Sequence, residues 1–464
     1  MILCRLIKYR FTNNIRNFSN LADLSPKERL VRCKEMAPKY RKDPVIKVLN
    51  TTEFTSIFTE ELNSLSSIFK QYGYEIRIAG GAVRDLLLGK QPKDLDFATT
   101  ATPDQMKTMF TEENIRMINM NGEKHGTITP RINDKENFEV TTLRIDVVTD
   151  GRHAEVQYTT DWFLDANRRD LTINSMFLGF DGTVYDYFYG FDDLQNKRIA
   201  FVGEASQRIQ EDYLRILRYF RFYGRIAEES NKHEEETLKA IRDNVDGLER
   251  ISGERIWVEL KKILEGNFAG EIMTKIIECN IGPYIGLPKD CNTEDLLNVW
   301  KHLQGVDTNA ITLLSSLINS DEEAMVLHGR LKFSAFERDL LLFLVQNRSP
   351  KLEEKPLKPY QRLVLLSKNN KTKLWVIELL KYLNSEHIKE FEDWDVPRFP
   401  VNGSMLKEKG IANGKEMGYV LNKLKDHWIE KDTCLSAEEI LKELPHILVQ
   451  LDLQLNNLLD PSNM

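Results

Sequence analysis

Asp94 and Asp96 are separated by a single residue in a short segment that also contains Leu95 and Phe97. If residues 94–98 form a strand, both carboxylates point to the same face of it. Two carboxylates placed in this way can hold two Mg²⁺ ions about 4 Å apart, an arrangement that promotes phosphoryl or nucleotidyl transfer. Taken alone, such a pair is more often a solvated strand end or turn, so the neighbouring residues decide between the two interpretations.

The residues before this pair have the pattern of an anion-binding site. Residues 76–79 predict a short buried strand, which Gly80 and Gly81 end. Helical spacing follows over 82–88, with Arg84 in the first turn. Glycines let a phosphate approach the backbone, a helix start offers free N–H groups, and Arg84 can add a bidentate phosphate contact. Glycine pairs often only turn the chain, but the aspartate pair shortly after this one favours a metal site that binds nucleotides.

A third carboxylate, Glu139, lies near the start of a strand-like run at 138–145. On a strand beside the aspartate pair, it could complete the metal site or accept the proton of an attacking hydroxyl. The other interpretation is an ordinary exposed acid. Together with helices expected at 54–72 and 103–110 and a strand at 125–132, these segments predict an α/β head with a small mixed sheet.

Three further segments of the head are assigned from local signals. Residues 146–161 are polar and contain the turn signal Asp150-Gly151, so they predict a mobile loop. Residues 182–188 predict a strand, and residues 190–194 predict a turn after it.

Arg168, Arg169 and Asp170 form a second group of charged residues that could bind a nucleotide. The guanidinium of Arg169 can hold a phosphate, and the carboxylate of Asp170 can accept a hydrogen bond from a ribose 2′-OH. By itself, such a triplet is usually a cluster of surface ion pairs.

Asp212 and Arg215 lie three residues apart in a helical run that begins near residue 204. At this spacing they would be neighbours on one helix, and a solvated ion pair is the simpler interpretation. The alternative is base recognition. Cytosine and adenine present an amino donor next to a ring-nitrogen acceptor, whereas uracil and guanine present a carbonyl and a ring N–H. A carboxylate beside a guanidinium therefore matches C and A and opposes U and G. Arg218 and Arg221 are expected to reach the phosphates or neighbouring base edges.

Taken in chain order, these motifs resemble those of the polymerase-beta-like nucleotidyltransferases. More narrowly, they resemble the class II CCA-adding tRNA nucleotidyltransferases and the related bacterial-type poly(A) polymerases. The matching segments are 80–85 with 94–96, 168–174, 190–194, 211–215 and 252–264.

The resemblance implies a template-independent enzyme that adds C, C and A to tRNA 3′ ends from CTP and ATP and releases pyrophosphate. It implies a two-metal Mg²⁺ site on Asp94 and Asp96, with Glu139 completing the catalytic set. The residues assigned to the nucleotide are Gly80, Gly81, Arg84, Arg169, Asp170, Asp212, Arg215, Arg218 and Arg221. Residues 190–194 become a hinge between head and neck. Residues 252–264, with Ser252 as N-cap, become a helix that supports the base-reading helix through carboxylate–arginine pairs.

The predicted fold class is α+β: an N-terminal polymerase-beta-like nucleotidyltransferase head, with a small mixed sheet and helices, followed by an all-α neck, body and tail. The expected limits are 54–200 for the catalytic head, 201–265 for the nucleotide-templating neck, 266–395 for the helical body and 396–464 for the tail. The tRNA 3′ end would lie in the cleft between head and neck. The segments 353–359 and 393–403 are linker candidates.

The tail resembles the family's tail, which packs against the tRNA elbow. Its glycines permit close backbone approach and its lysines suit a phosphate backbone, although composition alone would equally fit an ordinary lysine-rich helical end. The lysines concerned are Lys407, Lys409, Lys415, Lys423 and Lys425.

Composition excludes several classes of protein. The net charge of −7 excludes a generally basic nucleic-acid binder, so RNA contacts must come from local basic faces. No apolar run approaches the roughly 20 residues of a membrane span. The five cysteines form no CxxC pair, which predicts reduced thiols with neither a zinc site nor a disulfide framework. No obligate protein partner is evident.

The N-terminus has the composition of a targeting segment. Residues 1–22 carry basic and hydroxyl side chains, and no acid precedes Asp23. This predicts a mitochondrial transit peptide rather than a secretory signal, a disordered basic tail being the alternative. Met36 is a candidate internal start that would give a second product in the cytoplasm or nucleus.

Two other functions stay open at this point. One is a poly(A) polymerase of the same fold, or an enzyme that adds only part of CCA, because the first two motifs barely separate these activities. The other is a non-catalytic tRNA-binding protein, which would require Asp94 and Asp96 to be idle.

Overall fold

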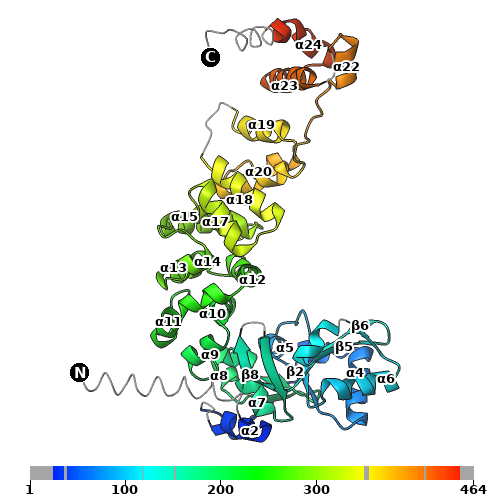
Figure 1. Ribbon diagram of the computed structural model, residues 1–464, viewed down its shortest axis with the longest axis vertical. Helices are drawn as coiled ribbons and strands as arrows, with labels where there is room; N and C mark the ends of the chain where they lie inside the picture. Colours follow the sequence, from blue (N-terminus) through cyan, green and yellow to red (C-terminus); the bar gives the residue numbers. More distant parts are fainter. Residues whose placement is uncertain are drawn as a thin grey trace, which may run out of the picture. The chain divides into compact units, whose positions relative to one another are not determined.

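The computed structural model of this protein describes residues 24–35, 39–118, 120–150, 153–349, 355–411 and 414–449 (Figure 1). The chain forms two compact units, Met1–Thr293 with Met325–Ser334 and Glu294–Ala324 with Ala335–Met464. The predicted transit peptide at 1–22 and the candidate start Met36 lie outside the described residues.

The first unit is built on a nine-stranded mixed sheet with the order β1-β11-β10-β2-β3-β7-β5-β4, in which β6 pairs with β5. Its strands are β1 (Val45–Val48), β2 (Ile76–Ala79), β3 (Asp96–Thr99), β4 (Arg116–Ile118), β5 (Thr127–Ile132), β6 (Glu136–Asn137), β7 (Glu139–Thr142), β10 (Phe177–Leu178) and β11 (Thr183–Tyr185). Strands β3 and β7 run parallel, and the other neighbours run antiparallel. The N-terminal ends of β3 and β7 therefore lie side by side.

Short helices pack against this sheet. Helix α5 (Gly81–Leu87) contacts β2, and α4 (Glu60–Gln71) and α6 (Pro103–Glu112) contact β5. Helix α6 begins as predicted, because Thr102 and Gln105 form a capping box. The predicted helix at 54–72 is wrong as a single element. It is divided into α3 (Thr52–Thr55) and α4, because Thr59 takes an extended conformation and its hydroxyl caps α4.

The predicted loop at 146–161 is also wrong. It contains most of an antiparallel hairpin, β8 (Arg144–Asp150) with β9 (His153–Tyr158); residues 151–152 lie outside the described part. The hairpin forms because Ile145 and Val147 alternate with polar residues and bury one face. They pack with Leu164 of α7 (Trp162–Asn167) and with side chains of α2 (Pro26–Glu35). The predicted turn at 190–194 is the short helix α8 (Gly190–Gln195).

The rest of the first unit is helical. Its α-helices are α9 (Ala205–Glu211), α10 (Arg215–Ile226), α11 (Glu235–Arg242), α12 (Gly253–Leu264), α13 (Ala269–Glu278) and α14 (Gly282–Ile285). Three short 3₁₀ helices complete it: η1 (Met120–His125), η2 (Thr172–Asn174) and η3 (Val245–Arg250). Helix α12 packs directly on α10, and α13 contacts both.

The described part of the second unit is helical. Its elements are α15 (Thr293–Leu303), α16 (Ala310–Leu314), η4 (Ser315–Leu317), part of α17 (Asp321–Leu331), α18 (Ala335–Asn347), α19 (Lys358–Leu366), α20 (Thr372–Tyr382), α21 (Ile388–Asp393), α22 (Gly403–Glu408), α23 (Lys415–Glu430) and α24 (Ala437–Leu441). The predicted linker at 393–403 is the segment between α21 and α22. The last helices have their own core around Leu406, Leu424 and Trp428.

The predicted fold class is therefore confirmed: a head with a mixed sheet precedes a long series of helices. Within the described residues, no helix is both long and apolar enough to cross a bilayer.

Candidate active site

The predicted carboxylates meet where β3 and β7 begin. Asp96 opens β3 and is in register with Glu139, which opens the parallel strand β7. Asp94 lies in a bend two residues before β3. The prediction that 94–98 form one strand is therefore wrong at its start. The reason is that β2 ends at Ala79, so residues 94 and 95 have no neighbouring strand to pair with.

These carboxylates form a cluster of like charge. Burial raises the pKa of Asp96, the neighbouring charges of Glu139 and Asp94 raise it further, and Arg169 opposes the shift. In the described part of the chain, none of the three carboxylates has a hydrogen-bond or ion-pair partner for its side chain. Mutual repulsion among hard oxygen donors is relieved by a divalent cation, so the donor set fits Mg²⁺.

Across the described ranges, no three His, Cys, Asp or Glu side chains converge closely enough to hold a metal ion by themselves. This is compatible with Mg²⁺, which is commonly bound by one or two carboxylates together with water and substrate phosphates.

The predicted glycine pair lies against Arg169. Gly80 has a φ of +66°, and a Cβ built on it would lie 3.0 Å from Nη1 of Arg169. A side chain at residue 80 would thus be strained and would crowd this guanidinium. Gly81 begins α5, so unpaired backbone N–H groups, the Arg169 guanidinium and the carboxylates belong to one neighbourhood.

Arg84 has different surroundings from those predicted. Its side chain is only 3% exposed. Its guanidinium donates to Asp85 (Nε to Oδ1, 3.0 Å) and to Asn174 (Nη1 to Oδ1, 2.6 Å). Burial lowers the pKa of Arg84, and Asp85 opposes this shift. All of these contacts are with protein groups, so direct phosphate contact by Arg84 has no support in this geometry.

One residue of the site is absent from the sequence prediction. Asp165, 1% exposed on α7, accepts hydrogen bonds from the side chains of both Arg168 (2.9 Å) and Arg169 (3.0 Å) and from the backbone N–H of Arg144 (3.2 Å). Burial would raise the pKa of Asp165, but Arg168 and Arg169 bring it below its ordinary value. The sequence contains a signal for these contacts: Asp165 precedes Arg168 by three residues and Arg169 by four, and residues at these spacings are neighbours on a helix.

Asp170 is also buried, and it contacts α10. Its Oδ2 accepts from Nε of Arg218 (2.7 Å), and its Oδ1 accepts from Nδ2 of Asn174 (3.4 Å). Burial alone would raise the pKa of Asp170, but the charges of Arg218 and Arg215 lower it to about 2. The carboxylate is therefore ionised and already paired.

The prediction that Asp212 and Arg215 share one helix is wrong. Asp212 is the extended C-cap of α9 (φ −154°, ψ 106°), and Arg215 is the first residue of α10. The break occurs because Oδ1 of Asp212 accepts from the backbone N–H of Leu214 (3.1 Å), which favours a turn over a continuous helix.

Asp212 and Arg215 also have separate ionic partners. Asp212 pairs with Arg255 of α12 (2.8 Å), and Arg215 pairs with Glu211 (2.5 Å). They are neighbours across a turn, each held by another charge.

Helix α12 supports this region as predicted. Arg255 reaches Asp212, and Glu259 pairs with Arg221 of α10 (2.6 Å). The guanidinium groups of Arg84, Arg218 and Arg221 lie 4.9, 5.6 and 4.2 Å from the ring centre of Phe222. Several cations therefore surround one aromatic ring between α5 and α10.

Comparisons with known proteins agree with this arrangement. A family model described as the poly A polymerase head domain matches residues 76–200, and one described as the probable RNA and SrmB-binding site of polymerase A matches residues 225–286. The chain is 54% identical to the Mus musculus protein named CCA tRNA nucleotidyltransferase 1, mitochondrial, over 85% of this chain and 92% of that protein. The chain belongs to the CCA tRNA nucleotidyltransferase family.

Solved structures of CCA-adding enzymes share the fold of this family member. The Bacillus stearothermophilus enzyme in complex with CTP has a TM-score of 0.68 at 24% identity, covering 88% of this chain and 100% of that one. The Thermotoga maritima enzyme complexed with tRNA has a TM-score of 0.62 at 20% identity, with the same coverage of both chains. The predicted family and enzyme class are thus confirmed.

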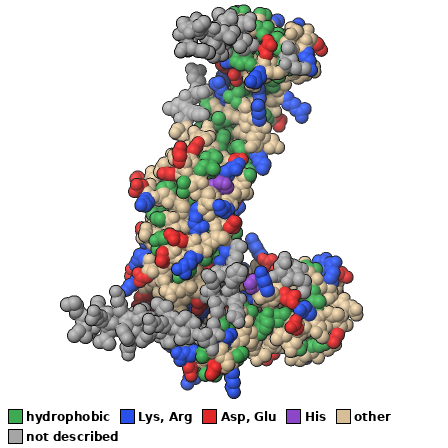
Figure 2. Space-filling model, viewed as in Figure 1, with side chains coloured by type: hydrophobic (Ala, Val, Ile, Leu, Met, Phe, Trp, Pro, Cys, Tyr) green, Lys and Arg blue, Asp and Glu red, His purple; other side chains and the backbone are tan. Residues whose placement is uncertain are grey.

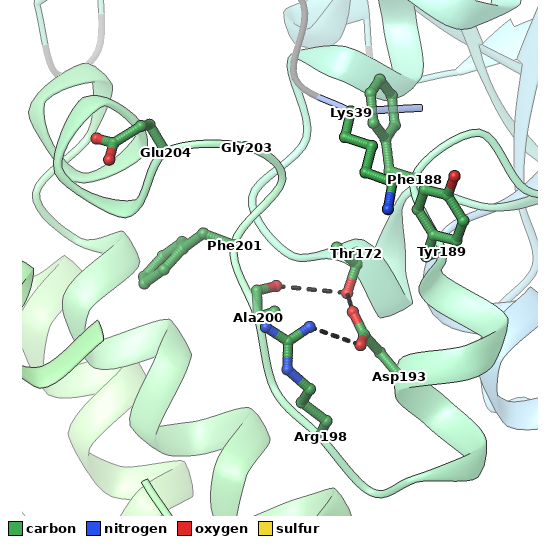
Figure 3. Close-up of a pocket in the computed structure, with 10 residues that line it drawn as sticks. All are labelled: Lys39, Thr172, Phe188, Tyr189, Asp193, Arg198, Ala200, Phe201, Gly203 and Glu204. Carbon is green, nitrogen blue, oxygen red and sulfur yellow. Dashed lines mark hydrogen bonds and ion pairs between the residues drawn. The ribbon is translucent and has the colours of Figure 1, made fainter. Parts of the chain in front are cut away.

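In this CCA tRNA nucleotidyltransferase, a pocket of about 560 Å³ is lined by Thr172, Asp193 and Arg198, among other residues (Figure 3). The Thr172 hydroxyl donates to Asp193 (2.6 Å), and Asp193 also accepts from Arg198 (2.7 Å). Asp193 belongs to α8, so these bonds tie the Asp170 loop to the segment predicted to be a hinge.

Proposed function

We propose that the protein is a Mg²⁺-dependent enzyme that adds C, C and A to the 3′ end of tRNA from CTP and ATP without a nucleic-acid template. One compact unit contains the Asp94–Asp96 pair, Gly80 next to Arg169, and the turn between Asp212 and Arg215. This combination of residues in one unit is the observation that carries the proposal. The names of the relatives in its family support the same activity.

Each part of the site has a proposed role. Asp94 and Asp96 would hold Mg²⁺, and Glu139 would complete the set or accept the proton of the tRNA 3′-OH. When bound, the metal would supply positive charge to the triphosphate and to the attacking oxygen. Gly81 and Arg169 would bind the triphosphate through a backbone N–H group and a guanidinium, and Gly80, whose own N–H donates to Met176, would let the phosphates approach the backbone closely.

The sugar and base would lie against α10. Asp170 would accept the hydrogen bond of the ribose 2′-OH, and Asp212 and Arg215 would bond to the edge of C or A. Arg218 and Arg221 would reach the nucleotide from the same helix. Arg84, which is buried, would act by orienting the loop that holds Asn174 and Asp170.

The tRNA would be held at two places, its 3′ end between the head and neck regions and its elbow on the tail. The proposed limits are 54–200 for the head, 201–265 for the neck, 266–395 for the body and 396–464 for the tail. Exposed lysines of α22 and α23 favour a phosphate contact in the tail.

We place the protein in the mitochondrion, because the family member from mouse carries that word in its name and residues 1–22 have a transit composition. A cytoplasmic or nuclear product starting at Met36 would lack α2, which packs on Ile145, Val147 and Leu164. That loss argues against a stable product from this start.

The test uses purified protein, Mg²⁺ and a tRNA transcript that lacks its last three nucleotides. Each NTP is supplied alone and then all together, and products are sized at single-nucleotide resolution. Addition of two C from CTP, then one A when ATP is present, supports the proposal. A long ladder from ATP alone would indicate a poly(A) polymerase, and addition of CC without A, or of A alone, would indicate a partial activity.

Two variants separate catalysis from binding. Asp94→Asn and Asp96→Asn should each lower the rate of C addition at least 1,000-fold while leaving tRNA binding intact, because the metal site is lost. Asp104→Asn, whose carboxylate is largely exposed on α6, is the matched control. Unchanged function of Asp94→Asn and Asp96→Asn in cells would favour the non-catalytic tRNA-binding protein.

A further inference from the structure

A chain of hydrogen bonds begins on α10 and enters the head. Nη2 of Arg225 donates to Oδ2 of Asp85 (2.7 Å), and Oδ1 of Asp85 accepts from Nε of Arg84 (3.0 Å). Nη1 of Arg84 then donates to Oδ1 of Asn174 (2.6 Å). Arg225 and Asp85 are not among the predicted site residues.

The same chain returns to α10. Nδ2 of Asn174 donates to Oδ1 of Asp170 (3.4 Å), and Oδ2 of Asp170 accepts from Nε of Arg218 (2.7 Å). The six side chains therefore close a ring that passes through α5, the 3₁₀ helix η2 and α10. Phe222 of α10 contributes an aromatic ring between Arg84 and Arg218.

Four of the six side chains are buried, whereas the two that attach the ring to α10 are partly exposed, Arg218 at 32% and Arg225 at 46%. The exposed fractions are 3% for Arg84, 8% for Asp85, 7% for Asn174 and 8% for Asp170. Hydrogen bonds between buried charged groups are strong, and removing one partner leaves the other without compensation. The buried bonds among Arg84, Asp85, Asn174 and Asp170 therefore form a stiff segment, and Arg218 and Arg225 join this segment to α10 nearer the surface.

Its two attachments to α10 are seven residues apart, at Arg218 and Arg225. Two helical turns correspond to about 10 Å along the axis, and residues at this spacing share a face. With Arg218 alone, α10 could rotate more easily about that point. The second attachment on the same face opposes this rotation, and it adds to the bond from Nη2 of Arg215 to the carbonyl oxygen of Arg168 (3.1 Å) at the start of the helix.

We propose that Asp85 and Arg225 are positioning residues that determine nucleotide specificity. The Asp85–Arg225 pair holds α10 so that Asp212 and Arg215 keep a fixed distance from Gly80 and Arg169. This inference rests on the proposed function, since it assigns base selection to the start of α10.

The expected defect is selective. Pairing of C or A with Asp212 and Arg215 needs directional hydrogen bonds, which weaken steeply when the partners are displaced. U and G do not match this pair, so they lose little when α10 moves. Asp96 and Glu139 lie on β3 and β7, and Asp94 lies just before β3, so these carboxylates keep their geometry. Loosening α10 therefore lowers the preference for C over U more than it slows the reaction itself.

The experiment measures kcat/KM for CTP and UTP on the shortened tRNA with the full-length protein. The variants are Arg225→Gln, Arg225→Lys, Asp85→Asn and the double variant Asp85→Asn with Arg225→Gln. Arg242→Gln is the matched control, because this arginine pairs with Glu235 within the exposed part of α11. The CTP-to-UTP ratio does not depend on the fraction of folded enzyme, so a partly unfolded variant still gives an answer.

We expect Arg225→Gln and Asp85→Asn each to lower the CTP-to-UTP ratio about tenfold. Arg225→Lys should keep most of the ratio, and the double variant should be no worse than Asp85→Asn. Arg242→Gln should match the unaltered protein. A ratio that stays unchanged in Arg225→Gln and Asp85→Asn overturns the inference. If the unaltered protein adds no C at all, the proposed function itself fails, and the inference fails with it.

Discussion

At the scale of single residues, carboxylates orient the arginines of the site before any nucleotide binds. Asp165 holds Arg168 and Arg169, Asp170 holds Arg218, and Glu259 holds Arg221. A guanidinium held in this way loses little conformational entropy when a phosphate arrives. The site is thus arranged for its ligand in advance.

Asp165 gives a direct prediction. Asp165→Asn should destabilise the protein by roughly 3 kcal/mol, because the partly buried Arg168 and Arg169 lose the carboxylate that they share. It should also raise the KM for CTP and ATP more than tenfold, because Arg169 is no longer held beside Gly80. Thermal unfolding and steady-state kinetics measure the two effects. A KM equal to that of Asp104→Asn would contradict the role given to Asp165.

Asp170 gives a pH-dependent prediction. Its pKa is about 2 in the folded protein against an ordinary value of 3.8. The ionised form therefore stabilises the fold by roughly 2 kcal/mol at neutral pH, in full above about pH 5, and this contribution is lost as the pH falls from about 4 to 2.

The Asp170 prediction is checked with thermal unfolding at several pH values. The melting temperature of Asp170→Asn should lie below that of the unaltered protein at pH 7, and the difference should shrink below pH 4. A difference that is constant from pH 7 to pH 3 would rule out this contribution.

The residue types of the site could be predicted from sequence, but not all of their partners. Asp94, Asp96 and Glu139 follow from carboxylate spacing next to a glycine pair. The pairing of Asp85 with Arg225 joins residues 140 positions apart, and only folding brings them together.

At the scale of elements, the break between α9 and α10 matters most. It gives Asp212 an extended backbone and starts α10 at Arg215. Apolar spacing predicts helix on both sides, yet the local bond from Asp212 to the N–H of Leu214 decides where one helix stops. Such local competition between side chain and backbone is not visible in hydrophobic periodicity. The hairpin at 144–158 escaped prediction for a different reason, because its polar composition and the Asp150-Gly151 turn signal are equally typical of a loop.

Helix α2 yields a prediction at this scale. Its side chains cover Ile145, Val147 and Leu164, and Lys34 pairs with Asp161. A protein that starts at Met36 should be less stable than one that starts at Asp23 by roughly 3 kcal/mol, because these buried side chains become exposed. Chemical denaturation of both forms measures the difference, and equal stability would show that α2 is dispensable.

At the scale of the whole molecule, a net charge of −7 must coexist with the proposed binding of an anionic RNA. Acidic and basic side chains are interspersed on the face seen in Figure 2. Local groups of lysines, rather than the overall field, would then contact the tRNA. The order of α/β head and helical remainder follows from periodicity, whereas the division into two compact units depends on packing that the sequence does not display.

The tail lysines test this picture. Changing Lys407, Lys409, Lys415 and Lys423 to Gln should weaken tRNA binding at 0.1 M salt roughly tenfold or more. The affinity should also depend less on the salt concentration, because a protein with fewer phosphate contacts releases fewer counterions when it binds. Binding of tRNA at several salt concentrations measures this. Four exposed lysines of the second unit that lie outside residues 396–464, Lys301, Lys368, Lys371 and Lys389, serve as the matched control set. An equal loss in both sets would contradict a tail-specific contact.

The closed ring between α5, η2 and α10 has a consequence for how the chain folds as it is synthesised. When the first 200 residues have left the ribosome, Asp170 has no Arg218 and Asp85 has no Arg225. Asp85 keeps its bond to Arg84 at that stage, but a buried carboxylate without its cation is unfavourable, so the loop that carries Asp170 cannot settle into its final state. Contacts between residues far apart in sequence also form slowly. Completion of α10 is therefore the event that lets the earlier part of the chain finish folding, and a nascent chain stalled before residue 225 should remain sensitive to proteases.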